Sequence, residues 1–161
     1  MVEMHLAAVR VELPTNTPIL LLQEAGGGRR TLPIYIGAAE ATAIAYALQG
    51  VVTQRPMTHD LMRDLLTELG ATVDCVVITE LRESTFFAEI RMTLTGQRHS
   101  VSARPSDAIA LAVRFGAEVP IYADEGVLDE AGVLFEADEE EHEVEQFREF
   151  LDNITPEDFI Q

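Results

Sequence analysis

The chain has 161 residues, of which 47% are hydrophobic, a formal net charge of −17 and one cysteine. This length and apolar content suit one globular domain with a sizeable core, and a single cysteine excludes an internal disulfide. No apolar stretch is long enough to span a bilayer and the N-terminus lacks the features of a signal peptide, so we expect a soluble cytoplasmic protein.

The acidic charge is concentrated towards the C-terminus. Residues 1–122 carry 13 acidic and 10 basic side chains, whereas residues 123–161 carry 15 acidic side chains and Arg148 as their only basic one. The body of the protein is therefore close to charge balance, and nucleic acid remains a possible partner. All basic residues are arginines, which favour bidentate contacts.

Alternating or continuous apolar stretches separated by turn residues predict strands in the first part of the chain. These strands cover residues 2–13, 19–24 and 30–36. Residues 38–49 are apolar on nearly every side and predict a buried helix, in which Glu40 is the one charged residue. Residues 58–69 predict an amphipathic helix that ends at Gly70. Its apolar face consists of Leu61, Met62, Leu65, Leu66 and Leu69.

The second part of the chain repeats this order. Strands are predicted at residues 72–81, 85–94 and 97–103, a helix at 105–115, a short strand at 119–122 and a short helix ending at Gly132. The hairpin-like loops favour an α+β fold with largely antiparallel or mixed sheets and packed helices. The strand-rich segment that leads into a helix occurs twice, which is compatible with a pseudo-repeat.

Two related motifs stand before helices: RPMTHDL at residues 55–61 and RPSDAI at residues 104–109. Proline biases the preceding Arg55 or Arg104 towards extended geometry, and Thr58 or Ser106 can cap the following helix. A helix N-terminus beside an arginine suits a phosphate group, so these four residues are candidate phosphate ligands. Capping alone is the simpler interpretation of both motifs.

Four side chains are candidates for catalysis: His59, Asp60, Glu40 and Asp107. His59 lies in the first turn of a helix, where the helix dipole disfavours added positive charge and so favours a neutral imidazole that can act as a base. A packing role for His59 is an equally weighted interpretation. The carboxylates Glu40, Asp60 and Asp107 would make a plausible oxygen-ligand set for Mg²⁺ or Mn²⁺ if the fold brings them together. We expect the two Arg-Pro motifs to meet in one cleft.

The sequence divides into a domain at residues 1–135 and an acidic tail at residues 136–161. Apolar residues recur in the tail at helical spacing, which predicts an amphipathic C-terminal helix on a charged tether. They are Val144, Phe147, Phe150 and Leu151. The tail either docks against a partner or the domain, or serves only to keep the chain soluble.

Three segments together resemble the bifunctional nuclease family, also called the DNase/RNase domain or domain of unknown function 151. They are LPIYIGAAEATAIAYALQG (32–50), RPMTHDLMRDLLTELGA (55–71) and SARPSDAIALAVR (102–114). The similarity spans roughly residues 4–132, and the tail is similar to that of actinobacterial members.

The resemblance implies a nuclease that acts on DNA and RNA phosphodiester bonds, for which we expect assistance from a metal ion. The near-balanced charge and the lack of lysine favour the alternative, a non-catalytic regulatory module that binds an anion or a protein partner. Apolar surface on the helices leads us to expect a homo-oligomer.

Overall fold

The computed structural model describes residues 1–134, and its first three strands form an antiparallel meander close to the predicted positions. They are β1 (Val2–Glu12), β2 (Thr17–Glu24) and β3 (Arg30–Tyr35). The register places Leu20 opposite both Val9 and Ile34, and all three side chains are at most 3% exposed. Because alternate residues of a strand share one face, this row builds the core side of the sheet.

A second antiparallel meander follows. Its strands are β4 (Thr72–Arg82), β5 (Thr85–Leu94) and β6 (Gln97–Ala103). Thr95 and Gly96 connect β5 to β6 with positive φ angles of 50° and 78°. Two positive φ angles in a two-residue loop match the right-handed twist of the flanking strands, which explains the tight hairpin.

The short strand β7 (Ile121–Ala123) joins the two meanders into one mixed sheet. It pairs antiparallel with β1 and parallel with β4, so the strand order is β6-β5-β4-β7-β1-β2-β3-β8. The last strand, β8 (Val133–Leu134), was not predicted because two residues carry no periodicity. The predicted α+β class with mixed pairing is confirmed.

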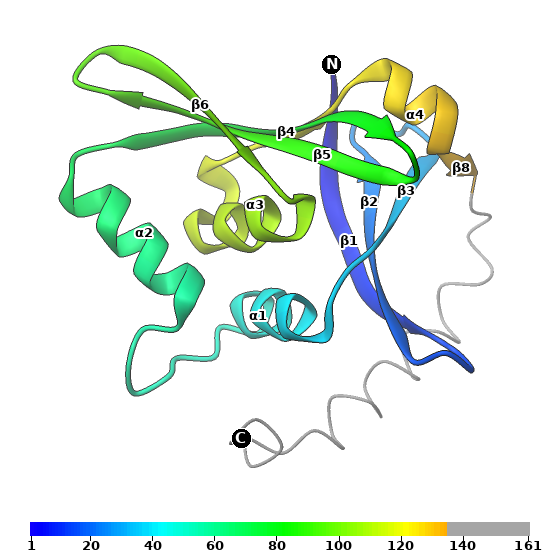
Figure 1. Cartoon of the computed structure of the whole chain (residues 1–161), viewed down its shortest axis with the longest axis horizontal. Coiled ribbons are helices and arrows are strands. Elements are labelled where there is room, and N and C mark those ends of the chain that lie inside the picture. Colours follow the sequence, from blue (N-terminus) through cyan, green and yellow to red (C-terminus); the bar gives the residue numbers. More distant parts are fainter. Residues whose placement is uncertain (135–161) are drawn as a thin grey trace.

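Helices follow each meander. They are α1 (Ala38–Leu48), α2 (Thr58–Glu68), α3 (Pro105–Ala112) and α4 (Glu125–Ala131). Figure 1 shows α1 and α3 in the angle between β1–β3 and β4–β6. The helix predicted at 105–115 is α-helical only to Ala112 and continues as a 3-10 segment, Val113–Glu118. No helix within residues 1–134 combines the length and the apolar character needed to cross a bilayer.

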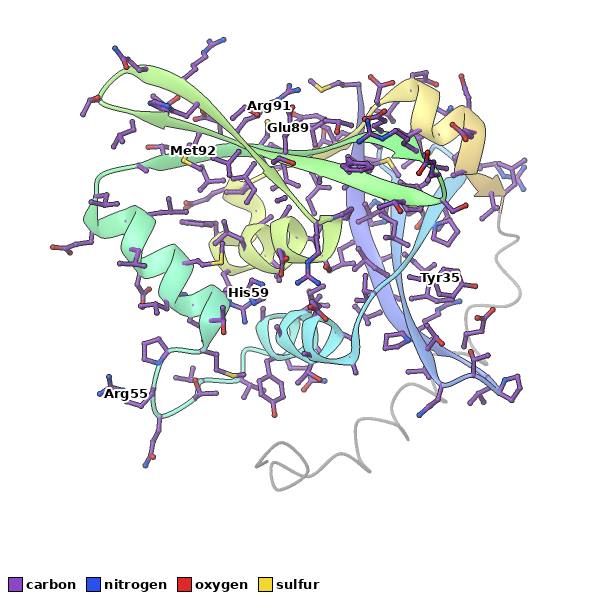
Figure 2. The ribbon with its side chains drawn as sticks, in the orientation of Figure 1. Tyr35, Arg55, His59, Glu89, Arg91 and Met92 are labelled. Carbon is purple, nitrogen blue, oxygen red and sulfur yellow. The ribbon has the colours of Figure 1, made fainter. Side chains whose placement is uncertain are left out.

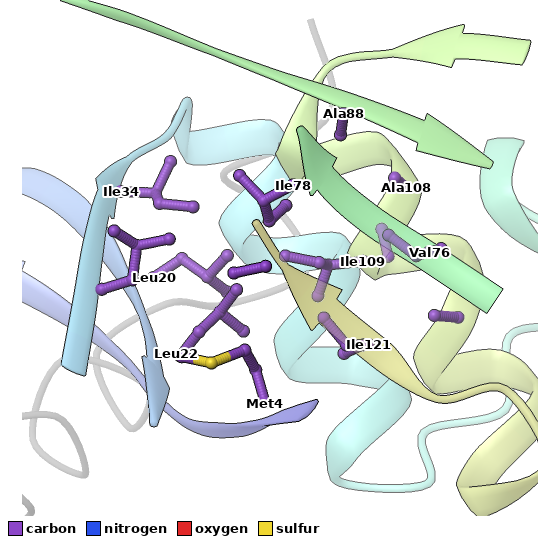
Figure 3. Close-up of a cluster of buried hydrophobic side chains, with 14 of the residues drawn as sticks. Met4, Leu20, Leu22, Ile34, Val76, Ile78, Ala88, Ala108, Ile109 and Ile121 are labelled. Atoms are coloured by element: carbon purple, nitrogen blue, oxygen red, sulfur yellow. The ribbon is translucent and has the colours of Figure 1, made fainter. Parts of the chain in front are cut away.

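The hydrophobic core lies between the sheet and these helices (Figure 3). Leu22, Ile78 and Ile109 are fully buried, and every residue of α3 except Asp107 is buried. Its alanines let the helix backbone approach β4 and β5 closely. Each large side chain buried in this way stabilises the fold by about 1.5–3 kcal/mol.

The apolar face of α2 is only partly buried, contrary to what its amphipathic pattern suggests. Met62 and Leu66 pack against the core, but Leu61, Leu65 and Leu69 are 50%, 54% and 68% exposed. The physical reason is the position of α2, which packs against α3 and the 3-10 segment at the margin of the molecule. Half of its leucine face is therefore left largely uncovered by residues 1–134.

Candidate functional site

The first turns of three helices are linked by one series of hydrogen bonds. Glu40 lies in the first turn of α1, His59 in that of α2 and Asp107 in that of α3, while Arg104 is the residue immediately before α3. Arg104 Nη2 donates to Glu40 Oε1 at 2.7 Å, and Arg104 Nε donates to Asp107 Oδ2 at 2.7 Å. His59 Nε2 lies 3.0 Å from Asp107 Oδ1. The fold thus unites four of the candidate residues, which are drawn from three separate sequence segments.

Exposure differs sharply along this series. His59 is only 8% exposed, whereas the Arg104 side chain is 66% exposed. Partial burial by itself would raise the pKa of Asp107, but the hydrogen bonds from Arg104 and His59 outweigh it and lower that pKa. Asp107 is therefore a carboxylate at neutral pH. The series thus combines the exposed guanidinium of Arg104 with the buried imidazole of His59.

Gly37 makes room for the carboxylate of Glu40 at the start of α1. A Cβ atom at this position would collide with Glu40 Oε2, so any larger residue would displace the side chain that holds Arg104. The φ of Gly37 is −76°, which every residue can adopt. The constraint on this glycine is therefore lack of space.

Asp60 lies beside His59 but has a different partner. Arg114 Nε donates to Asp60 Oδ1 at 2.6 Å, and the backbone N–H of Met57 donates to Asp60 Oδ2 at 3.0 Å. Burial would raise the pKa of Asp60, but these two hydrogen bonds prevail and lower it. Both oxygens are engaged, so Asp60 holds the N-terminus of α2 in place.

The sequence analysis missed Arg114, whose side chain is only 4% exposed. Its guanidinium also donates to the carbonyl oxygens of Ala110 and Ala43, at 2.6 and 3.1 Å, and so connects α3, α1 and α2. One signal in the sequence could have revealed it: Arg114 is the only cation at the end of an apolar helix, and a buried charge requires a partner.

The remaining candidate phosphate ligands do not join this series. Arg55 is exposed, and Figure 2 shows it pointing away from His59. The capping prediction for Thr58 and Ser106 was wrong. A capping residue directly precedes the first residue of a helix, but α2 begins at Thr58 itself and α3 begins at Pro105, so both hydroxyl residues lie inside their helices. The residues that precede these helices are Met57 and Arg104, and neither makes a side-chain capping bond. Thr58 is exposed in α2, and Ser106 is buried in α3.

The predicted metal-ligand set is not assembled. Glu40 and Asp107 bind Arg104, while Asp60 binds Arg114. Within the described residues, no group of three His, Cys, Asp or Glu side chains is arranged to hold a metal ion. The three carboxylates therefore do not fit the expected Mg²⁺ or Mn²⁺ site.

Comparison with known proteins places the chain in a family. The family model for the bifunctional nuclease domain matches residues 20–136. The chain belongs to this family. An uncharacterized protein of Mycobacterium tuberculosis is 50% identical over 98% of this chain and 97% of its own length.

Two plant relatives are more distant. Bifunctional nuclease 2 of Arabidopsis thaliana is 32% identical over 68% of this chain, which spans 34% of the plant protein. Bifunctional nuclease 2 of Oryza sativa subsp. japonica is 30% identical over 65% of this chain and 32% of its own length. Glu40, His59, Arg104 and Asp107 all lie within the segment that matches the bifunctional nuclease domain.

Proposed function

We propose that this bifunctional nuclease domain hydrolyses phosphodiester bonds of DNA and RNA at the His59–Asp107–Arg104–Glu40 series. The observation that carries the proposal is the meeting of three helix N-termini around one exposed guanidinium. Unpaired N–H groups and the positive ends of the helix dipoles favour a phosphate there.

His59 is proposed to move the proton. Asp107 Oδ1 holds Nε2, which is the one ring nitrogen of His59 that bonds a residue of the described chain. Nδ1 is then the nitrogen that takes a proton from the attacking water and returns it to the leaving oxygen. Asp107 stabilises the imidazolium formed in between, as an orienting carboxylate does for other catalytic histidines.

Arg104 is proposed to contact the phosphate. Glu40 and Asp107 engage Nη2 and Nε and hold the guanidinium plane, which leaves Nη1 for a phosphate oxygen. A fixed guanidinium stabilises the negative charge that develops on the phosphate in the transition state. Asp60 and Arg114 contribute by positioning α2, and no step requires them to touch the substrate.

A nuclease assay on highly purified protein tests the proposal with single-stranded DNA and RNA. His59→Ala should lower turnover by roughly 10²–10⁴-fold, the usual contribution of a positioned acid/base group. His5→Ala, which removes an exposed histidine from β1, is the matched control and should leave turnover unchanged. Equal turnover in the wild type and His59→Ala, with equal melting temperatures, would refute the assignment. A parallel arm with EDTA tests the separate prediction of metal assistance.

One observation favours a second candidate, a non-catalytic module that binds a protein partner. The exposed leucines Leu61, Leu65 and Leu69 lie one helical turn apart along α2, and exposed apolar stripes of this kind often mark interfaces. Absence of turnover in a protein that still shows a leucine-dependent association would favour this candidate. Self-association and a cytoplasmic location remain predictions.

A further inference from the structure

A groove of about 450 Å³ lies on the sheet β4–β6. Ala88 and Ile90 of β5 are buried against the helices, so the alternate residues Arg91 and Thr93 point to the opposite face. Figure 2 shows Arg91 on the side of the sheet away from α3. The groove is therefore separated by the sheet from the helix termini of the candidate site.

The lining of the groove is rich in hydrogen-bond donors. Arg98 is exposed, and no carboxylate of the described chain forms an ion pair with it. The neighbouring carboxylate of Asp74 accepts instead from Thr93 Oγ1, at 2.8 Å. Arg91 Nε and Nη2 share one oxygen of Glu89 at 3.2 Å. Among residues 1–134, the acceptor of Nη1 is the weak one, Met1 Sδ, 3.7 Å away. Two guanidiniums can thus accept a new anionic partner.

The strand register brings these two arginines together. Arg91 lies opposite Ser100, and Arg98 lies opposite Thr93. Arg91 and Arg98 are therefore diagonal neighbours on the same face, about 7–8 Å apart at the backbone and well within mutual reach of two long side chains. Arg82 occupies the same face, where its guanidinium lies 4.5 Å from the centroid of the Phe87 ring. Asp74, Glu80 and Glu89 lie on this face as well, so the groove offers an anion the free donors of Arg91 and Arg98 and not a net positive charge.

The candidate site cannot hold a polyanion by charge alone. It contains three carboxylates, Glu40, Asp60 and Asp107, against two guanidiniums, Arg104 and Arg114. A nucleic-acid strand therefore needs cationic contacts elsewhere on the molecule, since phosphate neutralisation supplies most non-specific affinity.

The edge strand β6 connects the groove to the candidate site. Arg98 lies near its start, and its last residue, Ala103, directly precedes Arg104. At the usual rise per residue the two arginines are about 20 Å apart along the strand. Because β6 is the outermost strand of the sheet, a ligand can pass around it from one face to the other.

We propose that Arg91 and Arg98 bind backbone phosphates of a single-stranded nucleic acid that continues around β6 to Arg104. This inference rests on the proposed nuclease function, because it assigns a second contact surface to the same substrate. The groove is open and lies on the flat face of a sheet, which suits a chain of phosphates better than an enclosed small molecule.

Fluorescence anisotropy with a labelled oligothymidylate tests the proposal on the full chain. Arg91→Gln/Arg98→Gln should weaken binding by roughly tenfold or more at low salt, since each arginine forms charge-assisted hydrogen bonds. The slope of log affinity against log salt should fall by about one for each lost contact. Arg98→Lys, a single substitution that keeps the charge, should retain much of the affinity of the wild type. Arg29→Gln, an exposed arginine outside the groove, is the control and should bind like the wild type.

Unchanged affinity and salt slope in the double variant, with a wild-type melting temperature, would overturn the proposal. Inorganic phosphate provides a second arm, monitored by NMR shifts of the arginine side chains. The double variant could lose phosphate binding and still bind oligothymidylate like the wild type. That result would show a site for small anions and would also overturn the proposal. The double variant should raise KM and leave kcat unchanged. Because anisotropy requires no turnover, the outcome stays readable if the chain proves not to be a nuclease.

Discussion

Two adjacent residues of α2 make polar contacts in different surroundings, one with α3 and one with the 3-10 segment that follows it. His59 contacts Asp107 beside the exposed Arg104, whereas Asp60 contacts the buried Arg114. Asp107 and Arg114 are seven residues apart, which places them on the same side of a helical path. Both contacts therefore fix the position of the first turn of α2, the His59 contact near solvent and the Asp60 contact at the buried Arg114 side chain.

We expect Asp60→Asn to destabilise the fold. Removal of one partner from a fully buried ion pair typically costs about 3–5 kcal/mol. Because the Asp60 side chain is 26% exposed and Arg114 keeps two carbonyl acceptors, we expect a loss at or below the lower end of this range. Urea unfolding monitored by circular dichroism measures the change. Asp64→Asn is the control, because Asp64 is exposed and its ion-pair partner within the described residues is Arg63 on the helix surface. Equal destabilisation by both substitutions would contradict the larger contribution expected of the Asp60–Arg114 pair.

The pH dependence provides an internal check of this first variant. The pKa of Asp60 is lower in the folded state than in the unfolded chain, where it is about 3.9. The carboxylate therefore contributes fully to the free energy of unfolding above that pH, and this contribution is lost as the pH falls through the lower folded-state pKa. Wild type and Asp60→Asn should therefore differ most at neutral pH and converge in strongly acidic buffer. A difference that persists there would mean that packing, and not the carboxylate charge, explains the loss.

At the scale of whole elements, α2 and α3 show how differently two apolar helices can be used. Nearly all of α3 is buried under β4 and β5, whereas His59 is the only buried residue of α2. The small alanines of α3 allow close packing on the sheet. Helix α2 instead supplies a histidine to the candidate site and leaves three leucines at the surface.

Alanine substitutions should separate these two uses. Ile109→Ala in α3 should cost about 2–5 kcal/mol, because it leaves a cavity in the core. Leu65→Ala in α2 should change the free energy of unfolding by less than about 0.5 kcal/mol, since the side chain is 54% exposed. Urea denaturation of both variants provides the comparison. A loss of more than about 2 kcal/mol in Leu65→Ala would indicate that a second molecule or another part of the chain covers the stripe in solution.

At the scale of the whole molecule, charge is distributed unevenly. Arginines and carboxylates share the face of β4–β6 that carries the groove, while the acidic excess is greatest in the C-terminal segment of the sequence. The predicted tail and its amphipathic helix at residues 136–161 lie outside the described residues. We predict that the tail carboxylates compete with phosphate for the arginine-bearing face of the domain.

A chain that ends at Ala137 tests this competition. It lacks ten acidic side chains and Arg148, and it should bind oligothymidylate more tightly than the full chain at low salt. The difference should shrink as the salt concentration rises, because the effect is electrostatic. Anisotropy titrations over a salt series measure it. Identical curves for both chains would leave the tail as a solubility or partner-binding segment.

Local patterns in the sequence determined most of the elements. Period-two apolar stretches and turn residues located β1 to β6, and the Arg-Pro motifs located the starts of α2 and α3 to within one or two residues. These features depend on neighbouring residues, so a single sequence contains the information. His59, Asp107, Arg104 and Glu40 were predicted as candidates from their places at helix starts, and the structure brings them together, while their catalytic roles stay a proposal.

Only the tertiary structure decided how these elements combine. It placed β7 between β1 and β4, paired Asp60 with Arg114 fifty-four positions away and left half of the α2 leucine face exposed. It also set Arg91 beside Arg98 through the β5–β6 register. Periodicity along a chain reports which residues share a face, but the partner of that face depends on packing between distant segments. The carboxylates were therefore predictable as candidates, whereas their engagement by Arg104 and Arg114 was not.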